Sequence, residues 1–187
     1  MNKIPTIFER DWDGDRSRVL DKPVAECAWV FAGEGRATRK YDGTCCLVVN
    51  GRLWKRHEVR AGKAEPEEFE LADYDAETGK TIGWVPVGGG PEDRWHREAF
   101  DSQAPEGTYE LVGPKIQGNP ERAESHVLIP HASAEEFGGV MRTFDGLQEF
   151  LSTHDIEGVV FHHPNGRMAK IKGRDFGVKR AALPTLP

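Results

Sequence analysis

The sequence predicts an α+β domain built mainly from antiparallel strands, with few helices. Two strand-like segments flank the Asn50-Gly51 pair, which is a strong signal for a two-residue β-hairpin turn. A second pair of such segments flanks Pro164-Asn165-Gly166. Only the segment 144–153 has the clear apolar periodicity of a helix. Antiparallel hairpins with few helices are typical of the α+β class.

The expected strands share apolar alternation or runs of β-branched residues. In chain order they cover 44–50, 52–59, 107–113, 126–131, 157–163 and 167–173. The helix over 144–153 places Leu147, Phe150 and Leu151 on one face, and a threonine or aspartate at its start can cap it. A second, polar helix is expected around 92–101. Segment 61–91 is acidic and rich in Gly and Pro, so we expect it to be a surface excursion.

The composition is that of a soluble globular protein and suits a single domain. The chain has 187 residues, of which 37% are hydrophobic and 30% charged. No apolar stretch reaches the about 18 residues of a membrane helix, and segment 1–17 lacks the apolar region of a signal peptide. Cys27, Cys45 and Cys46 lack zinc-type spacing, so we expect reduced thiols in the core. These features predict a cytoplasmic protein without a membrane partner, and we expect a monomer.

Charge is unevenly distributed along the chain, although the net charge is −6. Segment 65–77 holds acidic residues and no basic one, whereas Lys and Arg gather in 36–63 and 167–180. A phosphate group responds to the local field, so a basic site on an acidic protein remains compatible with RNA or DNA. Taken alone, the same charge runs are more simply explained as ordinary solvated surfaces.

Two patterns that could suggest other chemistry are incomplete. Gly79-Lys80-Thr81 matches the end of a phosphate-binding loop, but the glycine required five positions earlier is Tyr74. His154, His162 and His163 could suggest a zinc site, but no cysteine or other ligand follows them at metal-binding spacing. Neither pattern predicts a site.

Four other patterns occur in a fixed order along the chain. They are Lys40-Tyr41-Asp42-Gly43, then Trp54-Lys55-Arg56, then Tyr109–Pro114, and finally Glu157–Phe161 leading to Lys170-Ile171-Lys172. In the last pattern, Lys170 and Lys172 lie on the same face of one strand. Like charges side by side repel, which favours an anion between or above them. With Glu157 at the start of the paired strand, the pattern predicts a site for a metal-bound polyphosphate.

This ordered set resembles the covalent nucleotidyltransferases, which comprise ATP-dependent DNA and RNA ligases and GTP-using capping enzymes. The resemblance covers about residues 36 to 177. The segments 40–46, 83–98 and 109–131 look most similar to the small 5′-to-3′ RNA ligases known from vertebrates and some microbes. The resemblance implies one nucleotidyltransferase domain over 1–187, with no C-terminal oligonucleotide-binding domain.

The resemblance also implies the roles of the charged residues. Lys40 would attack the α-phosphate of ATP and carry AMP covalently, with Lys170 and Lys172 contacting that phosphate. Because a lysine with a pKa of about 10.4 is protonated at neutral pH, we expect neighbouring cations and burial to lower the pKa of Lys40. Arg56 would hold the ribose or phosphate side of the nucleotide, and Glu110 the ribose hydroxyl.

The remaining implied roles concern the metal, the base and the turn after Lys40. Glu157 would bind Mg²⁺ (or Mn²⁺), and Asp42 could assist the metal or the amine. Asp42 and Gly43 would set the turn that presents Lys40. His126 and Val160 would lie on opposite faces of adenine, and the backbone at Thr38-Arg39 would read its amino edge. His126 departs from the aromatic Phe or Tyr of the family.

The predicted function is that of an ATP-dependent RNA ligase. It would transfer AMP from Lys40 to an RNA 5′-phosphate and seal that end to a 3′-hydroxyl, as RNA repair requires. Two alternatives remain open at this stage. One is a DNA ligase or capping-type transferase, and the other is a non-catalytic nucleotide- or RNA-binding module with the same fold.

Overall fold

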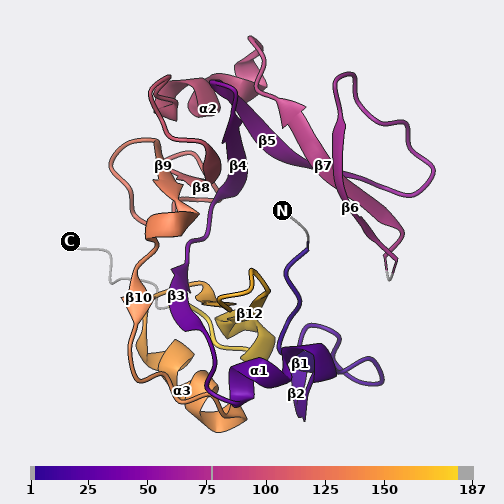
Figure 1. Cartoon of the computed structure of the whole chain (residues 1–187), viewed down its shortest axis with the longest axis vertical. Coiled ribbons are helices and arrows are strands. Elements are labelled where there is room, and N and C mark those ends of the chain that lie inside the picture. Colours follow the sequence, from indigo (N-terminus) through magenta and orange to yellow (C-terminus); the bar gives the residue numbers. More distant parts are fainter. Residues whose placement is uncertain (1–2, 77, 181–187) are drawn as a thin grey trace. The chain divides into compact units, whose positions relative to one another are not determined.

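The computed structural model describes residues 3–76 and 78–180, which form two compact units (Figure 1). Unit 1 contains residue 3 and residues 42–134, and unit 2 contains residues 4–41 and 135–180. Each unit has its own sheet and its own buried apolar cluster. The boundaries fall between Tyr41 and Asp42 and between Ala134 and Glu135.

Unit 1 is built on a six-stranded antiparallel sheet in the order β6-β7-β5-β4-β8-β9. The strands are β4 (Thr44–Val49), β5 (Arg52–Val59), β6 (Glu70–Asp75), β7 (Lys80–Pro86), β8 (Gly107–Val112) and β9 (Val127–Pro130). The 3₁₀ helix η2 (Pro91–Asp93) leads into the helix α2 (Arg94–Ala99), and the 3₁₀ helix η3 (His131–Ser133) follows β9. The buried cluster of this unit contains Cys46, Val48, Leu53, Tyr109, Leu111 and Ile116.

The hairpin between β4 and β5 follows from the local sequence. Asn50 and Gly51 both have positive φ, at 51° and 68°. This is the backbone of a type I′ turn, whose twist matches the flanking strands. The hairpin predicted at this position is therefore confirmed.

The prediction of a surface excursion over 61–91 is wrong. The segment contains β6 and β7, and β7 pairs with β5 from Val59↔Thr81 to Trp54↔Pro86. Ile82, Trp84 and Val85 are buried. The acidic and Gly-rich composition of the whole segment concealed one short apolar strand, whose burial depends on pairing with β5.

Unit 2 contains a four-stranded sheet in the order β10-β3-β11-β12 and a two-stranded β1-β2 sheet. The strands are β1 (Phe8–Arg10), β2 (Val19–Pro23), β3 (Arg36–Lys40), β10 (Glu136–Phe137), β11 (Gly158–His162) and β12 (Met168–Lys172). The helices are η1 (Ala25–Cys27), α1 (Ala28–Phe31), α3 (Phe144–Thr153) and η4 (Gly173–Phe176). The predicted hairpin around 164–166 is confirmed by the pairing of β11 with β12.

The predicted helix over 144–153 is confirmed as α3, whereas the second helix is shorter than predicted. The Thr143 hydroxyl caps α3 by accepting a hydrogen bond of 3.2 Å from the Gly146 N–H. Leu147 and Leu151 are buried against the sheet cluster of unit 2. The second helix, α2, ends at Ala99 because the backbone of Phe100 is already extended.

The predicted α+β class is confirmed, because mainly antiparallel sheets with few helices make up the described residues. Within residues 3–76 and 78–180, no helix combines the length and the apolar character required to cross a membrane.

Candidate functional site

Three lysines share one face of the four-stranded sheet in unit 2. In the centre of the sheet, Gly158 of β11 lies directly opposite Lys40 of β3 and Lys172 of β12. Lys170 lies two residues before Lys172 and therefore on the same face. On β12 the intervening Ala169 and Ile171 are fully buried in the apolar cluster. The alternation in this strand thus separates the core from a cationic face.

Glu157 connects two of these lysines through a nearly buried ion-pair network. Its two carboxylate oxygens accept hydrogen bonds of 2.5 Å, one from Lys40 Nζ and one from Lys172 Nζ. The side chains are 12% exposed for Glu157, 20% for Lys40 and 14% for Lys172. Burial disfavours the carboxylate, but the charges of the two lysines and their hydrogen bonds outweigh it and lower the pKa of Glu157.

Gly158 supports this arrangement by its lack of a side chain. A Cβ at this position would lie 2.2 Å from the carbonyl oxygen of Ile171. Any larger residue would therefore push β11 away from β12. The glycine lets the two strands pair closely and keeps the position between Lys40 and Lys172 unobstructed by a side chain.

Lys170 has an unusually low pKa, of about 8. Burial is the main cause, and the nearby positive charges of Lys172 and Lys40 lower it further. The carboxylates of Glu157 and Asp175 oppose this effect without reversing it. A lysine perturbed in this way, beside two other lysines, is a candidate for binding an anionic ligand.

Lys170→Met should change the pH dependence of stability in a defined way. In the unfolded chain Lys170 has the ordinary pKa of 10.5, whereas its pKa in the folded protein is about 8. Between these two pH values the unfolded chain keeps a proton that the folded protein has lost. Because the unfolded state then holds more protons, this group makes stability rise with pH between about 8 and 10.5. The variant should be more stable than wild type at pH 7, and its advantage should shrink toward pH 10.5 by up to about 1.4 kcal/mol per pH unit.

Urea unfolding of both proteins across this pH range measures the difference directly. Cysteine and tyrosine titrations affect both proteins and cancel in the comparison. An unchanged difference between pH 7 and pH 10.5 would contradict the lowered pKa of Lys170.

The other predicted residues of unit 2 lie close to this cationic face. Val160 is buried and lies directly opposite Thr38 and Lys170 in the sheet. The backbone N–H of Arg39 donates a hydrogen bond of 2.8 Å to the carbonyl oxygen of Glu135. This N–H group is therefore already engaged within unit 2. The Arg39 guanidinium lies 4.9 Å from the centroid of the Tyr41 ring.

In unit 1, Glu110 and Gly43 contact each other at the start of β4. Glu110 is buried, and its Oε1 accepts a hydrogen bond of 3.1 Å from the Gly43 N–H. A Cβ on residue 43 would lie 2.1 Å from the Leu111 carbonyl oxygen, so the position requires glycine for close approach to β8. The Asp42 N–H donates to Glu121 at 2.9 Å.

Arg56 and His126 contact aromatic side chains of unit 1. Arg56 lies in β5 with its guanidinium 5.8 Å from the Trp84 ring centroid. His126 is buried, stacks on Trp95 at 4.4 Å, and shares a hydrogen bond of 2.8 Å with Glu98. These contacts give the His126 ring a packing role within unit 1, and its predicted stacking on adenine stays a prediction.

The structure therefore groups the predicted residues by unit. Unit 2 holds Arg39, Lys40, Glu157, Val160, Lys170 and Lys172, and unit 1 holds Asp42, Gly43, Arg56, Glu110 and His126. Lys40 and Asp42 stand two residues apart along the chain, on either side of the boundary. The chemical roles assigned to all these residues stay predictions.

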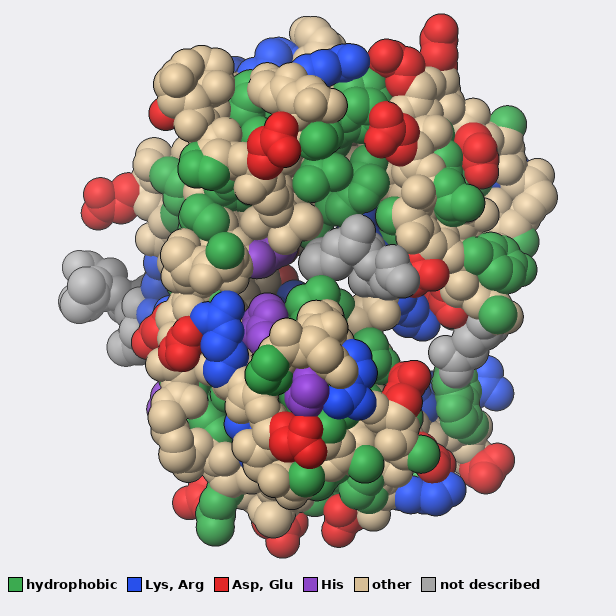
Figure 2. Space-filling model, in the orientation of Figure 1, with side chains coloured by type: hydrophobic (Ala, Val, Ile, Leu, Met, Phe, Trp, Pro, Cys, Tyr) green, Lys and Arg blue, Asp and Glu red, His purple; other side chains and the backbone are tan. Residues whose placement is uncertain are grey.

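Figure 2 shows acidic side chains at many separate positions on the visible face rather than in one patch.

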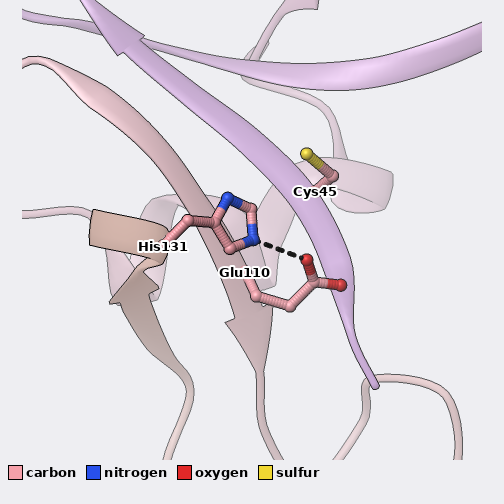
Figure 3. Close-up of side chains that lie close together, drawn as sticks. All are labelled: Cys45, Glu110 and His131. Atoms are coloured by element: carbon pink, nitrogen blue, oxygen red, sulfur yellow. Dashed lines mark hydrogen bonds and ion pairs between the residues drawn. The ribbon is translucent and has the colours of Figure 1, made fainter. Parts of the chain in front are cut away.

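A further group of side chains was not predicted from the sequence. Cys45, Glu110 and His131 lie close together in unit 1 (Figure 3), with their ligand atoms all within 4.8 Å of one another. Cys45 was expected to be a core thiol, but it is only half-buried, whereas Cys46 and Cys27 are buried. Neighbouring residues of a strand point to opposite faces, so the Cys45-Cys46 pair already contained the signal that one thiol lies outside the core.

No family model matches the chain. The chain is similar to a protein named RNA ligase 1 from Danio rerio, with 24% identity over 96% of this chain and 82% of the relative. It is also similar to proteins of the same name from Mus musculus and Rattus norvegicus, each with 22% identity over 76% of this chain and 67% of the relative.

Proposed function

We propose that this chain is an ATP-dependent RNA ligase that carries AMP on Lys40. The observation that carries the proposal is the face of unit 2 on which Lys40, Lys170 and Lys172 gather around Glu157. A purely structural sheet gains nothing from placing three like charges together. The cluster suits a ligand with several negative charges, and ATP is such a ligand.

The reaction begins with attack by the Lys40 amine on the α-phosphorus of ATP. A P–N bond forms, the bond to the bridging oxygen of pyrophosphate breaks, and the amine releases its protons to solvent. An oxygen of an RNA 5′-phosphate then attacks the adenylate, the P–N bond breaks, and the leaving Lys40 amine takes up protons from solvent. In the last step an RNA 3′-hydroxyl attacks the activated 5′-phosphate, AMP leaves, and the hydroxyl proton passes to solvent.

The ion pair with Glu157 defines the resting state of Lys40. A carboxylate 2.5 Å away favours the ammonium form, which cannot act as a nucleophile. Lys40 therefore becomes reactive only when its amine loses a proton and its hydrogen bond to Glu157 is released. Lys172 and Lys170 hold the phosphates and offset the charge that develops in the transition state.

The Glu157 carboxylate is a suitable ligand for Mg²⁺ (or Mn²⁺), since hard divalent cations prefer oxygen ligands. Both of its oxygens are engaged by lysines, so metal binding requires the release of one of these hydrogen bonds. When bound there, the ion would supply positive charge against the phosphates. We assign to Asp42 a supporting role at the metal, to Arg56 and Glu110 contacts with the ribose side of the nucleotide, and to His126 and Val160 contacts with adenine.

RNA is the proposed polymer because the proteins to which the chain is similar are named RNA ligases. The same name favours a ligase over a non-catalytic role. Both substrates of sealing are RNA ends, one with a 5′-phosphate and one with a 3′-hydroxyl.

Intact-mass measurement after incubation with ATP and Mg²⁺ tests the proposal. We expect the mass to increase by one adenylyl group, and the adduct to disappear when 5′-phosphorylated RNA is added. An adduct with GTP instead of ATP would favour a capping-type transferase. Preference for nicked duplex DNA would favour a DNA ligase, and reversible ATP binding without an adduct would favour a non-catalytic binding module.

A further inference from the structure

Three adjacent segments of unit 1 each contribute one potential metal ligand to the same face of the sheet. Cys45 of β4 lies directly opposite Glu110 of β8. On the other side of β8, Ile129 of β9 lies opposite Glu110, and His131 follows two residues later in η3. Figure 3 shows the three side chains close together. Their neighbours Cys46, Tyr109 and Leu111 belong to the apolar cluster on the opposite face.

The cluster offers one sulfur, one oxygen and one nitrogen atom to a cation. These ligand atoms all lie within 4.8 Å of one another, which allows a single ion to contact all three. Thiolate, imidazole and carboxylate together are typical ligands of Zn²⁺, which often binds three protein groups and one water molecule. A thiolate and an imidazole are poor ligands for Mg²⁺ or Ca²⁺, which prefer oxygen atoms.

The surroundings orient two of these ligands. His131 Nδ1 lies 3.0 Å from the Thr108 hydroxyl, and His131 Nε2 faces Glu110 at 3.1 Å. Histidines that bind metals usually have the second ring nitrogen held by such a polar partner, which sets the ring orientation. Glu110 is held through its other oxygen by the Gly43 N–H. His131 Nε2 and Glu110 Oε2 thus face each other, and an ion bound there would replace the hydrogen bond between them.

A hydrogen bond between Glu110 and His131 would by itself explain why these two side chains lie together. The third residue distinguishes a metal site from this simpler arrangement. Cys45 places a half-buried sulfur atom beside a carboxylate and an imidazole, whereas the adjacent Cys46 lies in the core. Glu110 is well shielded, with its side chain 10% exposed, and His131 is 27% exposed, which leaves access for an ion from solvent.

From this juxtaposition we propose that Cys45, Glu110 and His131 form a binding site for Zn²⁺, distinct from the magnesium site proposed at Glu157. Binding requires the Cys45 thiol to release its proton to solvent as the Zn–S bond forms. If Glu110 also contacts the ribose of ATP, as the proposed function requires, Zn²⁺ would compete with the nucleotide for this carboxylate. Zn²⁺ would then inhibit adenylation, whereas Mg²⁺ would support it.

Titration of the reduced, metal-free chain with Co²⁺ tests the site without relying on activity. Cobalt replaces zinc in such sites, and its bond to a thiolate gives a charge-transfer absorption in the near ultraviolet. We expect this band with one Co²⁺ per chain, and its loss when Zn²⁺ is added. Cys45→Ser should remove the band, and His131→Gln should weaken Co²⁺ binding at least about tenfold.

Cys46→Ala is the matched control, because it removes the neighbouring thiol, on the opposite face, and keeps an apolar side chain in the core. The control should retain the band. The proposal is overturned if wild type gives no band, if Cys45→Ser keeps it, or if Cys46→Ala loses it while remaining folded by circular dichroism.

A second measurement separates this site from the proposed ligase activity. Adduct formation with ATP and Mg²⁺ should be inhibited by Zn²⁺ in wild type and much less in Cys45→Ser. Equal inhibition of both proteins would overturn the competition at Glu110. If no adduct forms with any protein, the proposed function fails, while the cobalt band still decides whether the metal site exists.

Discussion

Replacing Lys40 with alanine is expected to reduce covalent attachment of AMP to background. The alanine variant lacks the amine that attacks ATP, and the other lysine opposite Gly158, Lys172, lies on a different strand from Lys40. Lys170 and Lys172 belong to β12, on the other side of β11. Incubation with [α-³²P]ATP and Mg²⁺, followed by denaturing electrophoresis, should therefore show label on wild type and none on Lys40→Ala.

Two further variants make this result specific. Lys40→Arg keeps a positive charge for Glu157, but its guanidinium stays protonated and cannot act as a nucleophile, so it should also remain unlabelled. Lys22→Ala removes a lysine of β2 whose side chain is 65% exposed and pairs with Glu9, and it should be labelled like wild type. Label on Lys40→Ala at the level of wild type would mean that another residue is the nucleophile.

Replacing Glu157 with glutamine is expected to destabilise the protein by about 3 kcal/mol at pH 7. It is also expected to abolish adenylation, because the carboxylate proposed to bind Mg²⁺ is lost. The substitution keeps the size of the side chain but removes the negative charge that holds Lys40 and Lys172 together. Both lysine side chains are mostly buried, so their remaining positive charges would repel each other with limited screening by solvent. Urea unfolding monitored by circular dichroism measures the loss of stability.

The pH dependence of this loss has a definite sign. Because the folded pKa of Glu157 is lowered below its ordinary value of 4.5, the carboxylate contributes its full stabilisation above that pH. The contribution disappears as the pH falls through the folded pKa. The difference between wild type and Glu157→Gln should therefore be largest near neutral pH and should shrink toward pH values well below 4.5.

Glu136→Gln provides a matched control for the loss of one carboxylate. Glu136 forms an ion pair with Arg36 in the same unit, but the two side chains are 57% and 43% exposed. An exposed pair of this kind contributes at most about 1 kcal/mol. If Glu136→Gln and Glu157→Gln destabilised the protein equally, the buried network around Glu157 would have no special role in stability.

Much of the local structure could be predicted because it depends on neighbouring residues. Asn50-Gly51 readily adopts the two positive φ angles of its turn, and the apolar spacing of residues 144–153 suits only a helix. The alternation in β12 placed Lys170 and Lys172 on one face, as the structure confirms. The approach of Glu157 to Lys172 followed from the same hairpin, because the two residues are only fifteen positions apart.

Other features could not be predicted, because they depend on strands that are far apart in the chain. The short apolar strand β7 was hidden in an acidic, Gly-rich segment, and its burial comes from pairing with β5. Its neighbouring strand β6 carries large exposed apolar residues, Leu71 and Tyr74, so local composition does not reveal its place in the sheet. Similarly, nothing near His126 in the sequence indicates that Trp95 covers its ring.

The sequence by itself determined the turns, the helix over 144–153 and the cationic face of β12, since short-range torsional preferences and side-chain alternation specify these within a few residues. Only the tertiary structure decided which distant side chains meet. Pairing of β3 with β11 brought together Lys40 and Glu157, which are 117 positions apart in the sequence. Pairing of β4, β8 and β9 brought Cys45, Glu110 and His131 together. The register of distant strands is set by the burial of their apolar faces over the whole sheet. A short segment of sequence does not contain that information.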